Sequence, residues 1–124
     1  MKAVNPKILQ ARQQLIDGML GYMEADSSDP DFDAGYTQAE VDRCSSILDA
    51  FLATLAPIDG PGNSAAIMEA TERAVLALND LNDECDGGLI ETDQREQLCE
   101  IIILAAKDAG LETDEDITEE WRDW

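Results

Sequence analysis

Apolar residues recur at three- and four-residue spacing in four separate stretches of the chain. This period is that of an amphipathic α-helix with one buried face. We expect helices over residues about 6-25, 38-56, 64-82 and 93-109. The predicted stripe of the second helix comprises Val41, Cys44, Ile47, Leu48, Phe51 and Leu55. The predicted stripe of the third helix comprises Ile67, Thr71, Ala74, Val75, Leu78 and Leu81.

Residues that begin and end helices stand beside these stretches. Thr37 followed by Glu40 has the spacing of a capping box, in which each side chain binds the backbone of the other residue. Asp93 and Glu96 repeat this spacing at the fourth stretch. Gly110 directly follows that stretch and predicts its C-terminal end, because glycine readily takes the left-handed conformation that closes a helix. These signals support the helix assignments made from periodicity.

The helix assignments define an all-α fold. Asp116 and Glu119 again have capping spacing and predict a short C-terminal helix over about 117-123. No stretch alternates apolar and polar residues as a β-strand does. Four helices with short connections are typical of an antiparallel four-helix bundle. A chain of 124 residues fits a single domain, 1-124.

Composition adds that this fold is strongly acidic and lacks histidine. There are 28 Asp and Glu residues against 8 Lys and Arg, which gives a formal net charge of -20. This field opposes direct contact with nucleic acid or an anionic membrane and favours a basic protein or a cation. Without histidine, Ser-His-Asp and Cys-His catalysis and HExxH zinc chemistry are excluded. We therefore expect a protein that is not an enzyme and that has no resident cofactor.

The acidic excess is concentrated in the second half of the chain. Residues 63–124 hold 18 acidic and 4 basic residues, whereas residues 1–62 hold 10 and 4. One cluster surrounds the third connection and comprises Asp80, Asp83, Glu84, Asp86, Glu91 and Asp93. The other lies in the C-terminal tail and comprises Glu112, Asp114, Glu115, Asp116, Glu119, Glu120 and Asp123. We expect these two clusters to supply the contact surface for a basic partner.

Two tryptophans stand within the tail cluster. Trp121 and Trp124 are three residues apart, so one helical face would carry both. Protein interfaces concentrate binding energy in aromatic anchors surrounded by a polar rim. We therefore add both residues to the predicted partner-binding surface. The alternative is that the indoles fold back onto the bundle and close its core.

These features predict a non-enzymatic acidic binding protein that neutralises or regulates a basic protein partner. Immunity proteins against nuclease toxins and nucleic-acid mimics are small acidic helical proteins of this kind, and the likeness lies in charge and size rather than in a motif. The N-terminus lacks an apolar signal segment, and the apolar run 101–106 is too short to span a membrane. Three cysteines without CxxC spacing indicate reduced thiols. We expect a bacterial, cytoplasmic protein.

A calcium site is the first alternative function. Residues 29–40 resemble the twelve-residue EF-hand loop, which takes oxygen ligands from positions 1, 3, 5 and 12. The candidate ligands at those positions are Asp29, Asp31, Asp33 and Glu40. Residues 82–93 form a weaker second match. The first loop departs from the pattern because Ala34 stands where the sharp turn favours glycine.

The remaining alternatives are a Mg²⁺-dependent hydrolase and a homodimer. An all-carboxylate hydrolase needs acidic pairs of the ExxE type that face the bundle interior. The pairs whose spacing comes close to this pattern are Glu69 with Glu72 and Glu96 with Glu100. These residues lie off the apolar stripes, which favours their exposure to solvent. The regular stripe of the second predicted helix is of the kind that supports self-association.

Overall fold

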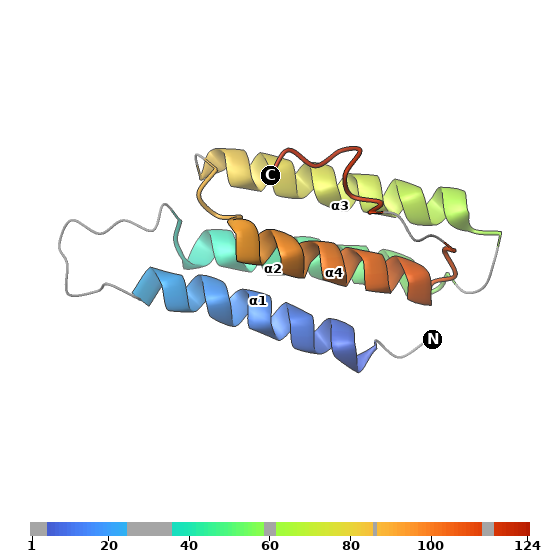
Figure 1. Ribbon diagram of the computed structural model, residues 1–124, viewed down its shortest axis with the longest axis horizontal. Coiled ribbons are helices and arrows are strands. Elements are labelled where there is room, and N and C mark those ends of the chain that lie inside the picture. Colours follow the sequence, from blue (N-terminus) through green and yellow to red (C-terminus); the bar gives the residue numbers. More distant parts are fainter. Residues whose placement is uncertain (1–4, 25–35, 59–61, 86, 113–115) are drawn as a thin grey trace.

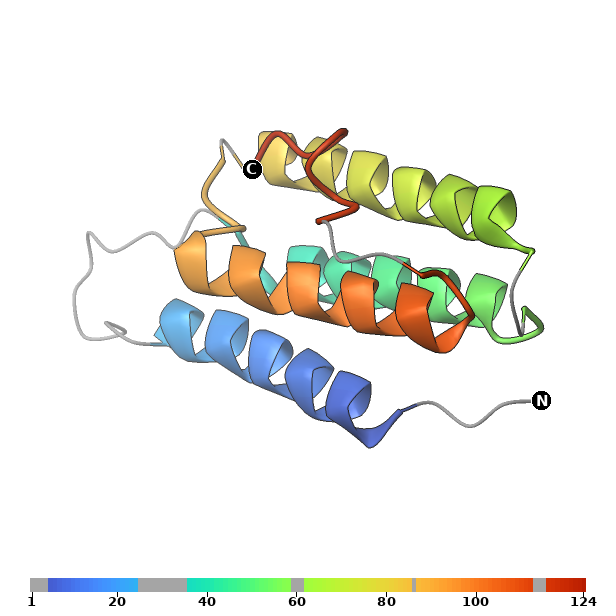
Figure 2. The same ribbon diagram turned by 45° about the vertical axis from the view of Figure 1, so that its right-hand side comes forward.

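The computed structural model describes residues 5–24, 36–58, 62–85, 87–112 and 116–124. The helices are α1 (Pro6–Glu24), α2 (Gln38–Leu55), α3 (Ser64–Glu84) and α4 (Thr92–Asp108). Their axes lie side by side (Figures 1 and 2). Helix α1 packs chiefly against α4, and α2 packs chiefly against α3. The described residues contain no strand, so the all-α prediction is confirmed.

The predicted apolar stripes form the core. All six stripe residues of α3 are buried, and in α2 only Ile47 of the predicted six remains partly exposed. At the centre of α4, Ile101 and Ile102 are fully buried, whereas Ile103 and Leu104 are partly exposed and pack against the edge of the core. The 3.6-residue period therefore identified the buried faces of α2 and α3 correctly.

The predicted start of α2 is confirmed, and the start of α4 differs by one residue. The Thr37 N–H donates to Glu40 Oε2 at 3.2 Å, and the Ala39 N–H donates to Thr37 Oγ1 at 3.3 Å. Helix α4 begins at Thr92 with Glu91 as its N-cap. The Glu91 N–H donates to Gln94 Oε1 at 3.1 Å, so Gln94 takes the role that the spacing had assigned to Glu96.

Helix α3 is longer than predicted, and the connection that follows it is packed against the core. The helix continues to Glu84, and the buried side chain of Asn82 in its last turn binds the following loop. Asn82 Oδ1 accepts hydrogen bonds from the N–H groups of Leu89 and Ile90 at 3.1 and 2.9 Å. Leu89 and Ile90 are themselves buried. The α3–α4 connection thus closes one end of the core.

The C-terminal segment forms turns over residues 117–121, where the sequence predicted a helix over about 117-123. The Arg122 N–H donates to Thr118 O at 3.0 Å, as in one turn of a helix. The neighbouring backbone groups bind α3 instead, through the side chain of Asn79. The segment therefore forms turns rather than the predicted helix: local backbone hydrogen bonds remain, and the Trp121 carbonyl and the Asp123 N–H bind Asn79.

Candidate protein-binding surface

The C-terminal tail, residues 116–124, crosses α3 and is held there by one buried amide. Asn79 Nδ2 donates to the carbonyl oxygen of Trp121 at 2.7 Å, and the Asp123 N–H donates to Asn79 Oδ1 at 3.2 Å. Figure 2 shows the tail in red beside the yellow half of α3. Because Asn79 satisfies one acceptor and one donor of the tail, it fixes both the position and the direction of the segment.

Both tryptophans contact the core and remain partly exposed. The side chains of Trp121 and Trp124 pack against the buried cluster. The guanidinium carbon of Arg122 lies 5.5 Å from the centroid of the Trp124 ring, within the range of a cation–π contact. Arg122 also lies 3.4 Å from Asp116 Oδ2. The indoles therefore help to anchor the tail, and each keeps an exposed part.

The acidic residues predicted to bind a partner are mostly exposed. Asp80, Asp83 and Glu84 are exposed near the end of α3, and Glu91 and Asp93 are exposed at the start of α4. In the tail, Glu119 and Glu120 are exposed and Asp116 is partly buried. The predicted contact residues Asp86, Asp114 and Glu115 lie outside the described residues. The structure thus leaves most of the predicted carboxylates open to solvent.

The tail brings the two acidic clusters to the same region of the molecule. The hydrogen bond from Asp123 to Asn79 joins residues 44 positions apart. Asn79 directly precedes Asp80, and Asp83 lies one helical turn further along α3. The tail therefore docks on the half of α3 that carries these acids. We call the exposed acids of the tail, of the end of α3 and of the start of α4 the acidic face (Asp80, Asp83, Glu84, Glu91, Asp93, Glu119, Glu120 and Asp123).

Few basic side chains neutralise this acidic face. Arg43 Nη2 binds Glu84 Oε2 at 2.7 Å, and this hydrogen bond lowers the pKa of the Glu84 carboxyl. Arg122 pairs with Asp116 rather than with the exposed acids of the tail. Among the described residues, Asp80, Asp83 and Asp93 make no ion pair. The face therefore keeps most of its negative charge available for an external cation.

The candidate calcium loop is only partly described. Asp29, Asp31 and Asp33 lie outside the described residues. Glu40 binds Thr37 in the capping box. The hydrogen bond from the Thr37 side chain lowers the pKa of the Glu40 carboxyl. In the weaker second match, Asn82 uses its side-chain oxygen to bind the loop backbone. Within the described ranges, no group of three or more Asp, Glu or Cys residues is placed to hold a metal ion.

The structure does not bring together the acidic residues of the hydrolase alternative. Glu69, Glu96 and Glu100 are exposed, and Glu72 is half-buried. Glu69 Oε1 binds Arg73 Nη2 at 2.7 Å on the surface of α3. No metal-binding group of three or more acids occurs in the part of the chain that the structure describes. The interior carboxylate cluster that this alternative requires is thus missing from the described bundle.

Two other predictions concern α2 and the cysteines. The stripe proposed for self-association is buried inside this chain, so α2 presents another face to solvent. Cys44, Cys85 and Cys99 form no disulfide within the described part of the chain. Burial raises the pKa of the Cys44 thiol to about 12, which keeps it protonated and unreactive near neutral pH.

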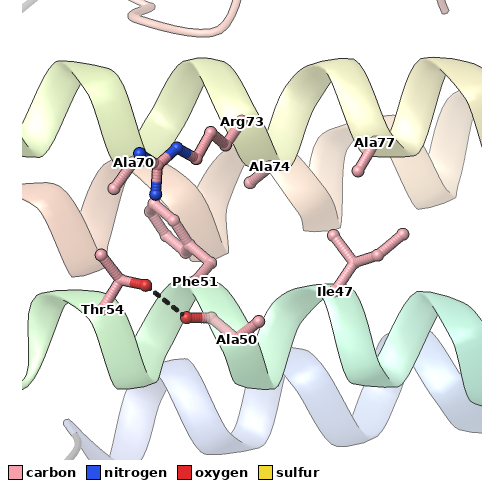
Figure 3. Close-up of a pocket in the computed structure, with 8 residues that line it drawn as sticks. All are labelled: Ile47, Ala50, Phe51, Thr54, Ala70, Arg73, Ala74 and Ala77. Carbon is pink, nitrogen blue, oxygen red and sulfur yellow. Dashed lines mark hydrogen bonds between the residues drawn. The ribbon is translucent and has the colours of Figure 1, made fainter.

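Sequence reasoning missed a groove between α2 and α3 (Figure 3). One hollow has a volume of about 230 Å³ and is lined by Ile47, Ala50, Phe51, Thr54, Ala70, Arg73, Ala74 and Ala77. A second, of about 320 Å³, is lined by Arg43, Ser46, Ile47, Ala77 and Asp80. The sequence feature that could have indicated this groove is the row of alanines at positions 70, 74 and 77, which recur at helical spacing along the edge of the α3 stripe.

Comparisons with known proteins add no family to this description. A scan against protein-family models, a search of curated proteins and a search of solved structures each found no match. Among the described residues, no helix combines the length and the apolar character needed to cross a membrane. The geometry and charge of this chain are therefore the basis for interpreting its function.

Proposed function

We propose that this chain is an acidic binding protein that neutralises or regulates a basic protein partner. An antiparallel four-helix bundle is its scaffold, and a toxin-immunity or nucleic-acid-mimic role is the type of activity that such a charge serves. The observation that carries the proposal is the acidic face, where the docked tail adds its carboxylates to those of α3 and α4. A bacterial cytoplasmic setting and the absence of enzymatic activity belong to the same proposal.

The fold leaves most carboxylates of the acidic face without an ion pair among the described residues. Exposed carboxylates raise the rate of encounter with a cationic surface, and this steering weakens as salt screens it. Carboxylates also present the acceptor groups that a nucleic-acid-binding protein normally meets on phosphates. A basic partner held on the acidic face is thereby kept from nucleic acid. The partly exposed edges of Trp121 and Trp124 supply apolar contact area beside these charges.

The test is capture of a partner by the immobilised chain from an extract of its own cells at low salt. We expect recovery of a basic protein whose capture is lost at high salt. The double variant Asp83→Asn/Asp93→Asn removes two charges of the acidic face, and Asp17→Asn/Asp42→Asn removes two exposed charges from α1 and α2 as a matched control. Recovery of no basic protein, or equal capture by the two double variants, contradicts the proposal.

A further inference from the structure

The groove between α2 and α3 runs along the outside of the bundle. Its two hollows adjoin each other, since both are lined by Ile47 and Ala77, and we call them together the α2–α3 groove. In Figure 3, Phe51 rises between the helices and forms part of the groove lining, with Arg73 next to it. Phe51 is only 3% exposed, so it belongs to the rigid core rather than to a mobile edge. The groove is therefore a fixed feature of the packed helices.

The length of the groove corresponds to a few turns of a helix. Along α3 it extends from Ala70 to Asp80, which at about 1.5 Å per residue is roughly 15 Å, or close to three helical turns. Its walls carry alanine at positions 50, 70, 74 and 77. Side chains this small let a second helix approach the α2 and α3 backbones closely, as ridges pack into grooves.

The charges around the groove select what can enter it. Arg73 is bound by Glu69 and Arg43 is bound by Glu84, so the basic groups of the lining are already neutralised by this chain. Asp80 lines the end of the groove near Arg43 and makes no ion pair with any described residue. The lining thus offers an apolar floor with one uncompensated carboxylate at its end, inside a chain with a net charge of -20.

We infer that the α2–α3 groove binds an amphipathic helix of the partner, with small or aliphatic side chains on the floor and a Lys or Arg side chain at Asp80. This inference rests on the proposed function, which makes the partner basic. A second copy of this chain suits the groove poorly, because two chains of this charge repel each other. A basic amphipathic helix satisfies both the apolar floor and the surrounding negative field.

The probe is a synthetic 18-residue helical peptide of Leu, Ala and Lys, with its apolar residues on one face. Binding is measured by calorimetry, and the site is mapped from the backbone amide shifts of the protein. We expect the largest shifts along 47–54 and 70–80. We also expect Ala50→Arg to weaken binding at least tenfold, because it adds bulk and positive charge to an exposed position of the groove. Asp80→Asn should weaken binding about threefold to tenfold.

The matched control is Ala53→Arg, which makes the same change at an exposed position of α2 outside the groove lining. It should alter the affinity less than twofold. A second peptide with Glu in place of Lys should not bind. If the Lys peptide fails to bind, or binds with equal affinity to Ala50→Arg and Ala53→Arg, the inference is overturned.

The inference and the proposed function fail in different ways. Peptide shifts confined to the tail and to residues 80–93, with no effect of Ala50→Arg, overturn the groove and leave the acidic face as the site. If wild type and Ala50→Arg capture a basic protein equally well, the groove is likewise overturned and the acidic face remains the candidate site. Failure to capture any basic protein contradicts the proposed function itself, whatever the peptide does.

Discussion

Removing the amide of Asn79 should release the C-terminal tail while the helices stay folded. Asn79 is buried and makes two hydrogen bonds to the tail backbone, one to Trp121 O and one from the Asp123 N–H. The variant Asn79→Ala deletes both bonds and adds no atoms that could clash. The tail carries both tryptophans of the chain, so their environment reports directly on whether it is docked.

The expected size of the effect follows from these two bonds. Each buried hydrogen bond contributes about 0.5–1.5 kcal/mol net, and a tail that stayed docked would leave a backbone carbonyl and an N–H without these partners. We therefore expect Asn79→Ala to cost about 1–3 kcal/mol of tail docking. A change of this size is enough to shift a marginally docked segment substantially toward solvent, since about 1.4 kcal/mol is tenfold in population.

The assay combines tryptophan fluorescence with urea unfolding followed by circular dichroism. In Asn79→Ala the emission maximum should move to longer wavelength, and quenching by acrylamide should increase, because Trp121 and Trp124 lose their contacts with the core. The helical signal should be unchanged in the absence of urea. The unfolding midpoint should fall.

The matched control is Asn82→Ala, one helical turn along α3. Asn82 is also buried, and its side chain binds the backbone of Leu89 and Ile90 rather than the tail. This variant should lower stability by a similar amount and leave the tryptophan emission unchanged. Wild-type emission and quenching in Asn79→Ala would refute the account of how the tail is held.

Further predictions concern α1, alkaline pH and the α2–α3 ion pair. Gly21→Ala should raise the free energy of unfolding by about 1 kcal/mol in urea titrations, because among the described residues no atom outside its own stretch of helix lies within 4 Å of the added methyl group, and alanine is the better helix former; a loss of stability would show that the position is constrained. Burial raises the pKa of Cys44 and of Tyr36 to about 12 in the folded chain, so the unfolded chain loses these protons first. Stability should therefore be maintained below about pH 9 and fall as pH rises toward 12, and Cys44→Ala should remove the earlier part of that fall; an unchanged pH profile in Cys44→Ala would contradict this assignment. Arg43→Gln should leave the unfolding midpoint nearly unchanged in the same titrations, since the Arg43–Glu84 pair is exposed, and a clear fall in the midpoint would show that the pair has a structural role.

The helices were predictable because burial on one helix face leaves a period in the sequence. Val41, Cys44, Leu48 and Leu55 recur on one face of α2, and all four are buried. The Thr37 cap was equally readable, since its partner Glu40 lies within the same turn. Local patterns of this kind depend on neighbouring residues and little on the rest of the fold.

The docking of the tail was not predictable in this way. Asp116 and Glu119 have the spacing of a helix start, yet Asn79, more than thirty residues earlier, decides the conformation of the segment. A buried asparagine gives no periodic signal that names its partner. The only hint was that Asn79 and Asn82 sit beside Leu78 and Leu81, where amides at the edge of a stripe indicate specific hydrogen bonds.

The candidate binding surfaces were predictable in charge but not in shape. The acidic clusters around residue 86 and in the tail are plain in the sequence, whereas their proximity depends on where the tail docks. The α2–α3 groove depends on how two helices meet, because Ala50 and Ala74 come from different helices and only their packing leaves a hollow between them.

The most direct test of the central claim is the salt dependence of the affinity for the captured partner. Calorimetry of the purified pair should give a dissociation constant that rises steeply between low and high salt. At low salt, Asp83→Asn/Asp93→Asn should bind about tenfold more weakly than wild type and show a shallower salt dependence, while Asp17→Asn/Asp42→Asn should bind nearly as wild type does. An affinity that is insensitive to salt, or equal in the two double variants, would contradict a function based on the acidic face.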